Sequence, residues 1–248
     1  MGRYLALMGS GENSPIMVTP HQKIIKGTGT NLNPINLNTP YSFQENKEEL
    51  SAKIEKYFEV NVGTKINTSE NHLDDINKAN WVFAGPGSPT YNLKQWKQRN
   101  IDTALIELLK RGSLVLASAA AMSIGNKVMP VYEMYRVGED PHWVDGVGIL
   151  ESALGFKAVV IAHYNNTQGG THDTRFCFVG ERRMNELESQ LDPDIAILGI
   201  DEHTGVAFDL ENRTAEVFGK GVFTFKKNGQ VRIFENRSII KIDEFKQI

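Results

Sequence analysis

The stretch Leu114-Val115-Leu116-Ala117-Ser118-Ala119-Ala120-Ala121-Met122 decides the fold. Its first four residues form a continuous apolar run, which is typical of a central strand that is buried on both faces of a parallel sheet. A helical pattern follows directly, with no loop between the two elements. The stretch therefore predicts a strand that passes straight into a helix, with Ser118 at the junction.

Elements of the same two kinds alternate over most of the chain. Apolar runs of strand length and helical patterns predict an α/β protein in which helices cover both faces of a mostly parallel sheet, a three-layer sandwich. No helix clearly begins after the turn at 9–14, and a polar stretch from His21 to Pro40 contains one short strand at Ile35–Leu37. The other predicted strands lie at 4–8, near 60–66, and at 81–84, 158–161 and 195–198, and the other helical patterns lie at 46–58, 93–96, 104–109 and 184–191.

The last part of the chain has a different pattern. Four short apolar segments follow one another closely, at 206–209, 215–218, 222–226 and 231–235. The dipeptide Asn228-Gly229 is a strong signal for a tight hairpin turn. We therefore expect an antiparallel strand segment at the C-terminal end. Because no linker or repeat interrupts the sequence, we interpret residues 1–248 as a single domain.

Composition limits the classes of function. With 248 residues and 40% hydrophobic content, the chain can bury a substantial core, which excludes disorder. Lys and Arg number 27 against 30 Asp and Glu, a net charge of −3, so we expect neither nucleic acid nor a membrane as partner. The single cysteine, Cys177, and the lack of an apolar leader favour a cytoplasmic location. We predict no metal and no cofactor, because the histidines lack metal-site spacing and the turn at 9–14 lacks the third glycine of a dinucleotide site.

Three side chains that follow separate strands could form a catalytic group, because reactive groups collect beyond the carboxyl ends of strands in open α/β sheets. Ser118 is placed as a nucleophile would be, although serine at such a junction is also a preferred helix cap. His163 could be the base that takes the serine proton, or a hydrogen-bonded structural residue. Glu202 could orient the imidazole, or lie solvated in its loop.

Five segments occur in an order and spacing that are typical of one family. They are Phe83–Leu93, Ala117–Met122, His163-Tyr164, His172–Arg175 and Gly199–Thr204. Together they resemble the serine peptidases that include dipeptidase E and cyanophycinase. The resemblance implies a flavodoxin-like fold similar to that of class I glutamine amidotransferases. It also implies that Ser118 is the nucleophile, His163 the base and Glu202 the acid, with Asp201 or Glu133 as alternatives for the third member.

The resemblance implies roles for three further residues. The backbone N–H groups of Gly87 and Ala119 would form an oxyanion hole, which stabilises the negative charge of the transition state. Arg175 would bind an acidic side chain of the substrate, because its planar guanidinium suits a carboxylate. The alternative for Arg175 is a surface salt bridge with Asp173 or Glu181.

The chain departs from the family pattern at three positions. Leu116 and Ala120 replace the glycines on either side of the serine, where backbone segments approach closely. Pro86 replaces a glycine of the glycine-rich turn and has no N–H to donate. These differences weaken the prediction of activity and leave the prediction of the fold intact.

We therefore expect a serine hydrolase that cleaves a small peptide or amide bond, favouring an aspartyl residue before the scissile bond. The alternative is a catalytically impaired amidotransferase-like module that binds a metabolite or a protein, which Leu116, Ala120 and Pro86 would favour. The C-terminal edge strands could pair between two chains as a homodimer, or be covered within one chain.

Overall fold

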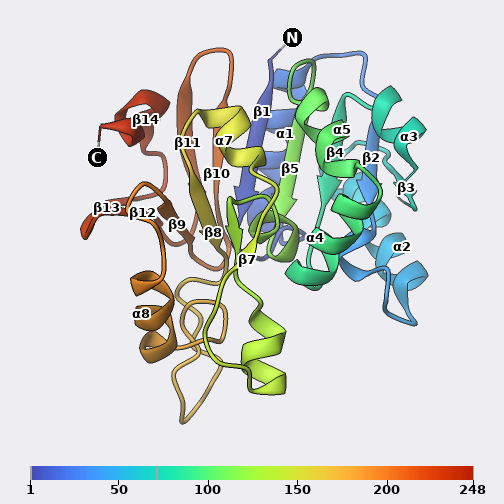
Figure 1. The fold of residues 1–248 in the computed structure, drawn as a ribbon. Coiled ribbons are helices and arrows are strands. Elements are labelled where there is room, and N and C mark those ends of the chain that lie inside the picture. Colours follow the sequence, from blue (N-terminus) through green and yellow to red (C-terminus); the bar gives the residue numbers. More distant parts are fainter. Residues whose placement is uncertain (1, 71, 248) are drawn as a thin grey trace.

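The computed structural model describes residues 2–70 and 72–247. Within these residues the larger sheet has eight strands, in the order β14-β11-β10-β1-β5-β4-β2-β3 (Figure 1). Strands β1, β5, β4, β2 and β3 pair in parallel, and β10, β11 and β14 are antiparallel. The strands are β1 (Tyr4–Met8), β2 (Pro34–Leu37), β3 (Asn67–Ser69), β4 (Trp81–Ala84), β5 (Ser113–Ala117), β10 (Thr204–Asp209), β11 (Thr214–Gly219) and β14 (Ile239–Lys241).

A second, four-stranded sheet has the order β13-β12-β9-β8, counted over the described part of the chain. Strands β8 and β9 are parallel, whereas β12 and β13 are antiparallel and joined by the predicted turn at Asn228-Gly229, where both residues have positive φ. These strands are β8 (Ala158–Ile161), β9 (Ala196–Ile200), β12 (Phe223–Lys227) and β13 (Gln230–Phe234), and a separate pair joins β6 (Lys127–Val128) to β7 (Val144–Asp145). The predicted fold class, a mostly parallel central sheet among helices with antiparallel C-terminal strands, is confirmed.

Helices lie on both faces of the larger sheet because successive side chains of each strand point to opposite faces. In β5, Leu114 and Leu116 face a core shared with helices α3, α4, α5 and α7, whereas Val115 and Ala117 face a core shared with α1 and α2. Helix α8 packs on the second sheet (Figure 1). The helices are α1 (Val18–Thr28), α2 (Lys47–Tyr57), α3 (Leu73–Lys78), α4 (Pro89–Gln98), α5 (Ile101–Leu108), α6 (Ala119–Met122), α7 (Ile149–Leu154) and α8 (Glu181–Ser189).

Two local predictions are wrong. Residues 21–28, the first part of the polar stretch that begins at His21, lie in α1. The buried positions of this helix follow helical spacing but include the polar residues His21 and Thr28, so the apolar signal is weak. The strand expected near Val60–Ile66 is absent from those residues. Instead a π-helical turn, Phe58–Val62, prolongs α2 and ends at Gly63, and β3 begins four residues later.

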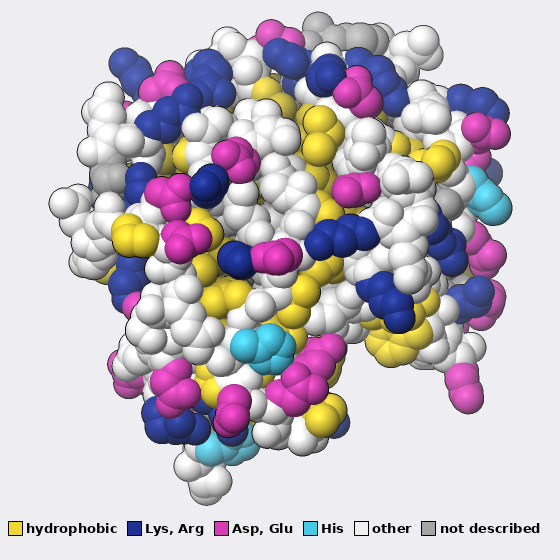
Figure 2. Space-filling view, in the orientation of Figure 1, with side chains coloured by type: hydrophobic (Ala, Val, Ile, Leu, Met, Phe, Trp, Pro, Cys, Tyr) yellow, Lys and Arg dark blue, Asp and Glu magenta, His cyan; other side chains and the backbone are white. Residues whose placement is uncertain are grey.

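Surface character is mixed on the face shown in Figure 2. Acidic and basic side chains are interspersed over that face, without a large area of one sign among the residues drawn in colour. No helix within residues 2–70 and 72–247 is both long and apolar enough to cross a bilayer.

Candidate active site

Ser118 occupies a strained turn between β5 and α6. Its backbone angles are φ 48° and ψ −116°, a conformation that residues with a side chain rarely adopt. The backbone N–H of Ser118 donates to Met8 O at 2.9 Å, which fixes the turn against the carboxyl end of β1. Strain of this kind costs about 1–3 kcal/mol and persists only where the surrounding structure enforces it. The turn directs the hydroxyl toward His163, with Ser118 Oγ 2.9 Å from His163 Nε2.

His163 connects Ser118 to a carboxylate. It follows β8 with a positive φ of 48°, and its Nδ1 lies 3.1 Å from Glu202 Oε1. A carboxylate at Nδ1 holds the proton on that nitrogen, so that Nε2 is left to accept the serine proton. The side chains of His163 and Glu202 are only 20% and 22% exposed. The structure therefore brings together the three side chains that the sequence placed at the ends of separate strands.

The geometry also separates Glu202 from the two alternative acids. Asp201 Oδ2 accepts the backbone N–H of Val222 at 2.9 Å, so this carboxylate supports the start of β12. Burial raises the pKa of Asp201. Glu133 Oε1 accepts the hydroxyl of Thr90 at 2.7 Å. Among the described carboxylates, only Glu202 hydrogen-bonds to the imidazole.

Two asparagines that the sequence analysis missed hold Glu202 in place. Asn166 Nδ2 donates to Glu202 Oε1 at 2.9 Å, the same oxygen that faces His163. Asn165 Oδ1 accepts the backbone N–H of Glu202 at 2.8 Å. Both asparagines follow His163 in the loop after β8, so polar amides close behind a histidine at a strand end were the available signal. Asn166 therefore helps to hold the carboxylate beside the imidazole, and Asn165 holds the backbone of Glu202.

The Ser118 hydroxyl opens into a cavity of about 180 Å³. Gly87 and Ala119 also line it, and the backbone N–H of neither residue donates to another group among residues 2–70 and 72–247. Buried or half-buried amides are normally paired, so two free donors beside a serine hydroxyl could bind an oxyanion. Gly87 has φ 151°, and a Cβ there would lie 1.8 Å from Pro40 O, so only glycine fits.

The three departures from the family pattern do not block Ser118. Leu116 is fully buried in the core that β5 shares with α3, α4, α5 and α7, so its side chain does not cover the serine hydroxyl. Ala120 lies in the same core, and its backbone N–H donates to Gly85 O at 3.3 Å. Pro86 is exposed at the tip of its turn. The turn keeps the serine hydroxyl in contact with His163 despite these residues.

Arg175 lies outside the cavity that Ser118 lines and is held by two acidic side chains. Its guanidinium binds both carboxylate oxygens of Asp173, at 2.9 and 2.8 Å, and Glu181 Oε2 at 2.9 Å. This pairing holds the pKa of Asp173 well below its ordinary value. Asp173 also accepts the backbone N–H of Glu181 at 2.8 Å, so the cluster fixes the start of α8. The contacts of Arg175 are those of the salt-bridge alternative, and its substrate-binding role stays a prediction.

A left-handed turn covers one side of the cavity. Phe176, Cys177 and Phe178 all have positive φ, and the backbone N–H of Cys177 donates to His163 O at 3.2 Å. The Phe178 ring lies 6.2 Å from the His163 ring, measured between centroids. Burial raises the pKa of Cys177 to about 12, so its thiol stays protonated near neutral pH. The turn positions the histidine loop and does not supply a second nucleophile.

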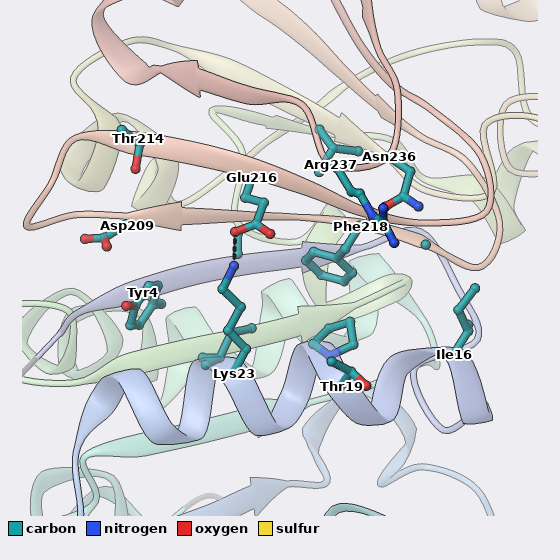
Figure 3. Close-up of a pocket in the computed structure, with 15 residues that line it drawn as sticks. Tyr4, Ile16, Thr19, Lys23, Asp209, Thr214, Glu216, Phe218, Asn236 and Arg237 are labelled. Atoms are coloured by element: carbon teal, nitrogen blue, oxygen red, sulfur yellow. Dashed lines mark hydrogen bonds and ion pairs between the residues drawn. The ribbon is translucent and has the colours of Figure 1, made fainter.

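A larger cavity, about 490 Å³, lies between α1 and strands β10 and β11 (Figure 3). Lys23 of α1 reaches across it to form an ion pair with Glu216 of β11. The residues that line this cavity include no histidine and no cysteine, so none of its hydroxyl groups is paired with an imidazole. The smaller cavity is therefore the better candidate for the active site, because Ser118 and His163 both line it.

Comparison with known proteins shows likeness in structure. No protein-family model and no curated protein matches the sequence. The solved structure of a peptidase from an acI-B1 Actinobacterium superposes with a TM-score of 0.75 at 18% identity, covering 97% of each chain. A Listeria monocytogenes EGD-e protein, whose structure is titled as a candidate peptidase E, gives a TM-score of 0.56 at 14% identity, covering 96% of this chain and 100% of that one. The chain has a peptidase E-like fold.

Proposed function

We propose that this protein is a serine hydrolase that cleaves a small peptide or amide bond through an acyl-enzyme on Ser118. The observation that carries the proposal is the continuous chain of hydrogen bonds from Ser118 Oγ to His163 Nε2, at 2.9 Å, and from His163 Nδ1 to Glu202 Oε1, at 3.1 Å. A serine hydroxyl is a weak nucleophile unless an oriented base takes its proton, and this arrangement supplies both base and orientation.

The first half of the reaction forms the acyl-enzyme. His163 Nε2 takes the hydroxyl proton as Ser118 Oγ bonds to the carbonyl carbon of the substrate. The carbonyl oxygen becomes an oxyanion, which the N–H groups of Gly87 and Ala119 stabilise. The C–N bond then breaks as His163 returns the proton to the leaving amine. Glu202 stays ionised and stabilises the imidazolium while it exists.

The second half releases the acid product. His163 Nε2 takes a proton from water as the water oxygen bonds to the acyl carbon. The bond from that carbon to Ser118 Oγ breaks, and His163 returns the proton to Ser118. One water is consumed for each amide bond cleaved, and the side chains end in their starting protonation states. No group beyond these residues and water is needed for the balance.

The fold supports the same proposal when it is taken together with the site. Both solved structures named above carry peptidase in their titles, and each aligns over nearly the whole chain. Fold alone does not determine function. It gains weight here because the serine, the histidine and the carboxylate form one hydrogen-bonded group at the carboxyl ends of β5, β8 and β9. An aspartyl residue before the scissile bond is part of the proposal.

The direct test is hydrolysis of a panel of short peptides that includes aspartyl dipeptides, with products separated and identified by mass spectrometry. We expect a free amine and a free acid from the wild-type protein and neither from Ser118→Ala. Ser123→Ala is the matched control, because the Ser123 hydroxyl donates to the backbone carbonyls of Pro89 and Ala119 and does not touch His163. Tight peptide binding without any product would contradict hydrolysis and favour a binding module.

A further inference from the structure

The cavity at Ser118 contains one permanent charge. Its lining includes Ser118, the side chains of Tyr132, Tyr135 and Phe178, and Arg136. No aspartate or glutamate among the described residues lines it. Cys177 also lines the cavity, but its raised pKa keeps it neutral. Among the residues that line the cavity, Arg136 is therefore the one with a permanent positive charge, which can attract a substrate anion.

Arg136 has no acidic partner in the described part of the chain. It belongs to a π-helical turn, Glu133–Val137, and is exposed. Its guanidinium lies 5.6 Å from the centroid of the Tyr135 ring, a distance at which the ring face attracts a cation. The ring holds the guanidinium in place and does not neutralise its charge, so the donors of Arg136 remain available to an anion.

The surroundings of Arg136 strengthen its attraction for a carboxylate. Tyr132, Tyr135 and Phe178 line the cavity beside it, and the Tyr135 and Phe178 rings lie 5.5 Å apart, measured between centroids. A bound substrate that packs on these rings would also cover the exposed guanidinium, and charges attract more strongly once water is excluded from between them. A planar guanidinium can also bind both oxygens of a carboxylate, which adds orientation to the attraction.

We propose that Arg136 is the residue that binds a carboxylate of the substrate at this site. The proposal rests on the proposed hydrolysis, and it places the anion-binding role on Arg136 instead of Arg175, whose donors are occupied by Asp173 and Glu181. The carboxylate can come from an acidic side chain of the substrate or from the free C-terminus of a short peptide. Both present the same planar anion to Arg136.

Binding to the Ser118→Ala protein, measured by isothermal titration calorimetry, tests this without turnover. The probes are Asp-Leu, Asn-Leu and Asp-Leu amide, in which the second removes the side-chain charge and the third removes the C-terminal charge. We expect one of the two neutralised peptides to bind about tenfold or more weakly than Asp-Leu, as for a lost charged hydrogen-bonded pair. The peptide that loses affinity identifies the source of the carboxylate.

The variant Arg136→Gln, added to Ser118→Ala, is expected to abolish this discrimination, which is the difference in affinity between Asp-Leu and the neutralised peptide. Arg136→Lys is expected to retain part of it. Arg99→Gln is the matched control, because Arg99 is exposed, lies outside the cavity and has no ion pair within residues 2–70 and 72–247. Arg136 is exposed as well, so its loss should leave the melting temperature unchanged. Discrimination that survives Arg136→Gln, or that disappears equally in Arg99→Gln, would overturn the proposal.

Failure of this inference is distinguishable from failure of the proposed function. If Ser118→Ala binds the three peptides equally, or binds none of them, Arg136 has no carboxylate-binding role, whatever the wild-type protein hydrolyses. If discrimination depends on Arg136 but the wild-type protein releases no product, hydrolysis is wrong and the carboxylate site stands.

Discussion

Replacing Glu202 by glutamine removes one negative charge from the chain of hydrogen bonds and keeps the size of the side chain. Glu202 Oε1 receives two hydrogen bonds, from His163 at 3.1 Å and from Asn166 at 2.9 Å, and a glutamine oxygen can receive both. The substitution therefore leaves the geometry of the site largely intact. What it removes is the attraction between a carboxylate and the imidazolium that forms when His163 takes the serine proton.

The size of that attraction follows from the distance and the burial. The two side chains are 20% and 22% exposed, so an effective dielectric constant between that of water and that of a dry interior applies. Unit charges about 4 Å apart at an effective dielectric constant of about 20 attract by about 4 kcal/mol. A loss of about 4 kcal/mol from the transition state corresponds to a decrease in rate of about a thousandfold.

The rate of Ser118 modification by a fluorophosphonate measures this effect without a known substrate. We expect Glu202→Gln to lower that rate by about a thousandfold. Asp201→Asn is the matched control, because Asp201 is the neighbouring carboxylate and faces the backbone of Val222 instead of the imidazole. A rate for Glu202→Gln within a few-fold of wild type, or an equal loss in Asp201→Asn, would refute the role assigned to Glu202.

Three further predictions concern the oxyanion turn, a buried histidine and the cysteine. Gly87→Ala should lower the fluorophosphonate rate about a hundredfold or more, because the added Cβ would lie 1.8 Å from Pro40 O and displace a donor amide. In Gly85→Ala the added Cβ meets only the Phe83 ring, at 3.4 Å, so this control should change the fluorophosphonate rate little. Equal rates for the two variants would contradict the oxyanion role assigned to the Gly87 N–H. Burial lowers the pKa of His21 from 6.5 to about 4, so the unfolded chain binds a proton that the folded chain does not, and stability should fall by about 3 kcal/mol as pH drops from 6.5 to 4. Urea unfolding across this pH range should show this loss of stability in the wild-type protein and not in His21→Phe. Because burial raises the pKa of Cys177 to about 12, iodoacetamide should leave it unmodified in the folded protein at pH 8, and rapid alkylation seen by mass spectrometry would contradict its burial.

The positions of the three candidate catalytic residues along the chain were predictable because each comes one or two residues after the end of an apolar strand. The run Leu114–Ala117 ends at Ser118, and the corresponding runs before His163 and Glu202 end near those residues. Strands β8 and β9 are parallel neighbours, so His163 and Glu202 lie at the same edge of the four-stranded sheet. Ser118 follows β5 of the eight-stranded sheet, so its contact with His163 depends on how the two sheets are placed, which strand ends alone do not show.

Other features lacked a periodic signal. Helix α1 was missed because two of its four buried positions, His21 and Thr28, are polar. The cavity wall from Val131 to Arg136 is a short helical segment that ends in the π-helical turn Glu133–Val137, and so short a segment gives too little periodicity to be recognised in the sequence. The state of Arg175 depends on where its side chain finds a partner, and a sequence does not show whether Asp173 or a ligand occupies it.

Mass-spectrometric mapping of the fluorophosphonate adduct tests the central claim most directly, because it identifies the nucleophile and its base together. We predict a single adduct on Ser118, formed by the wild-type protein and slowed at least about a thousandfold in His163→Ala. An unmodified Ser118, an adduct at another residue, or modification of Ser118 at the same rate in His163→Ala would contradict a serine activated by that imidazole.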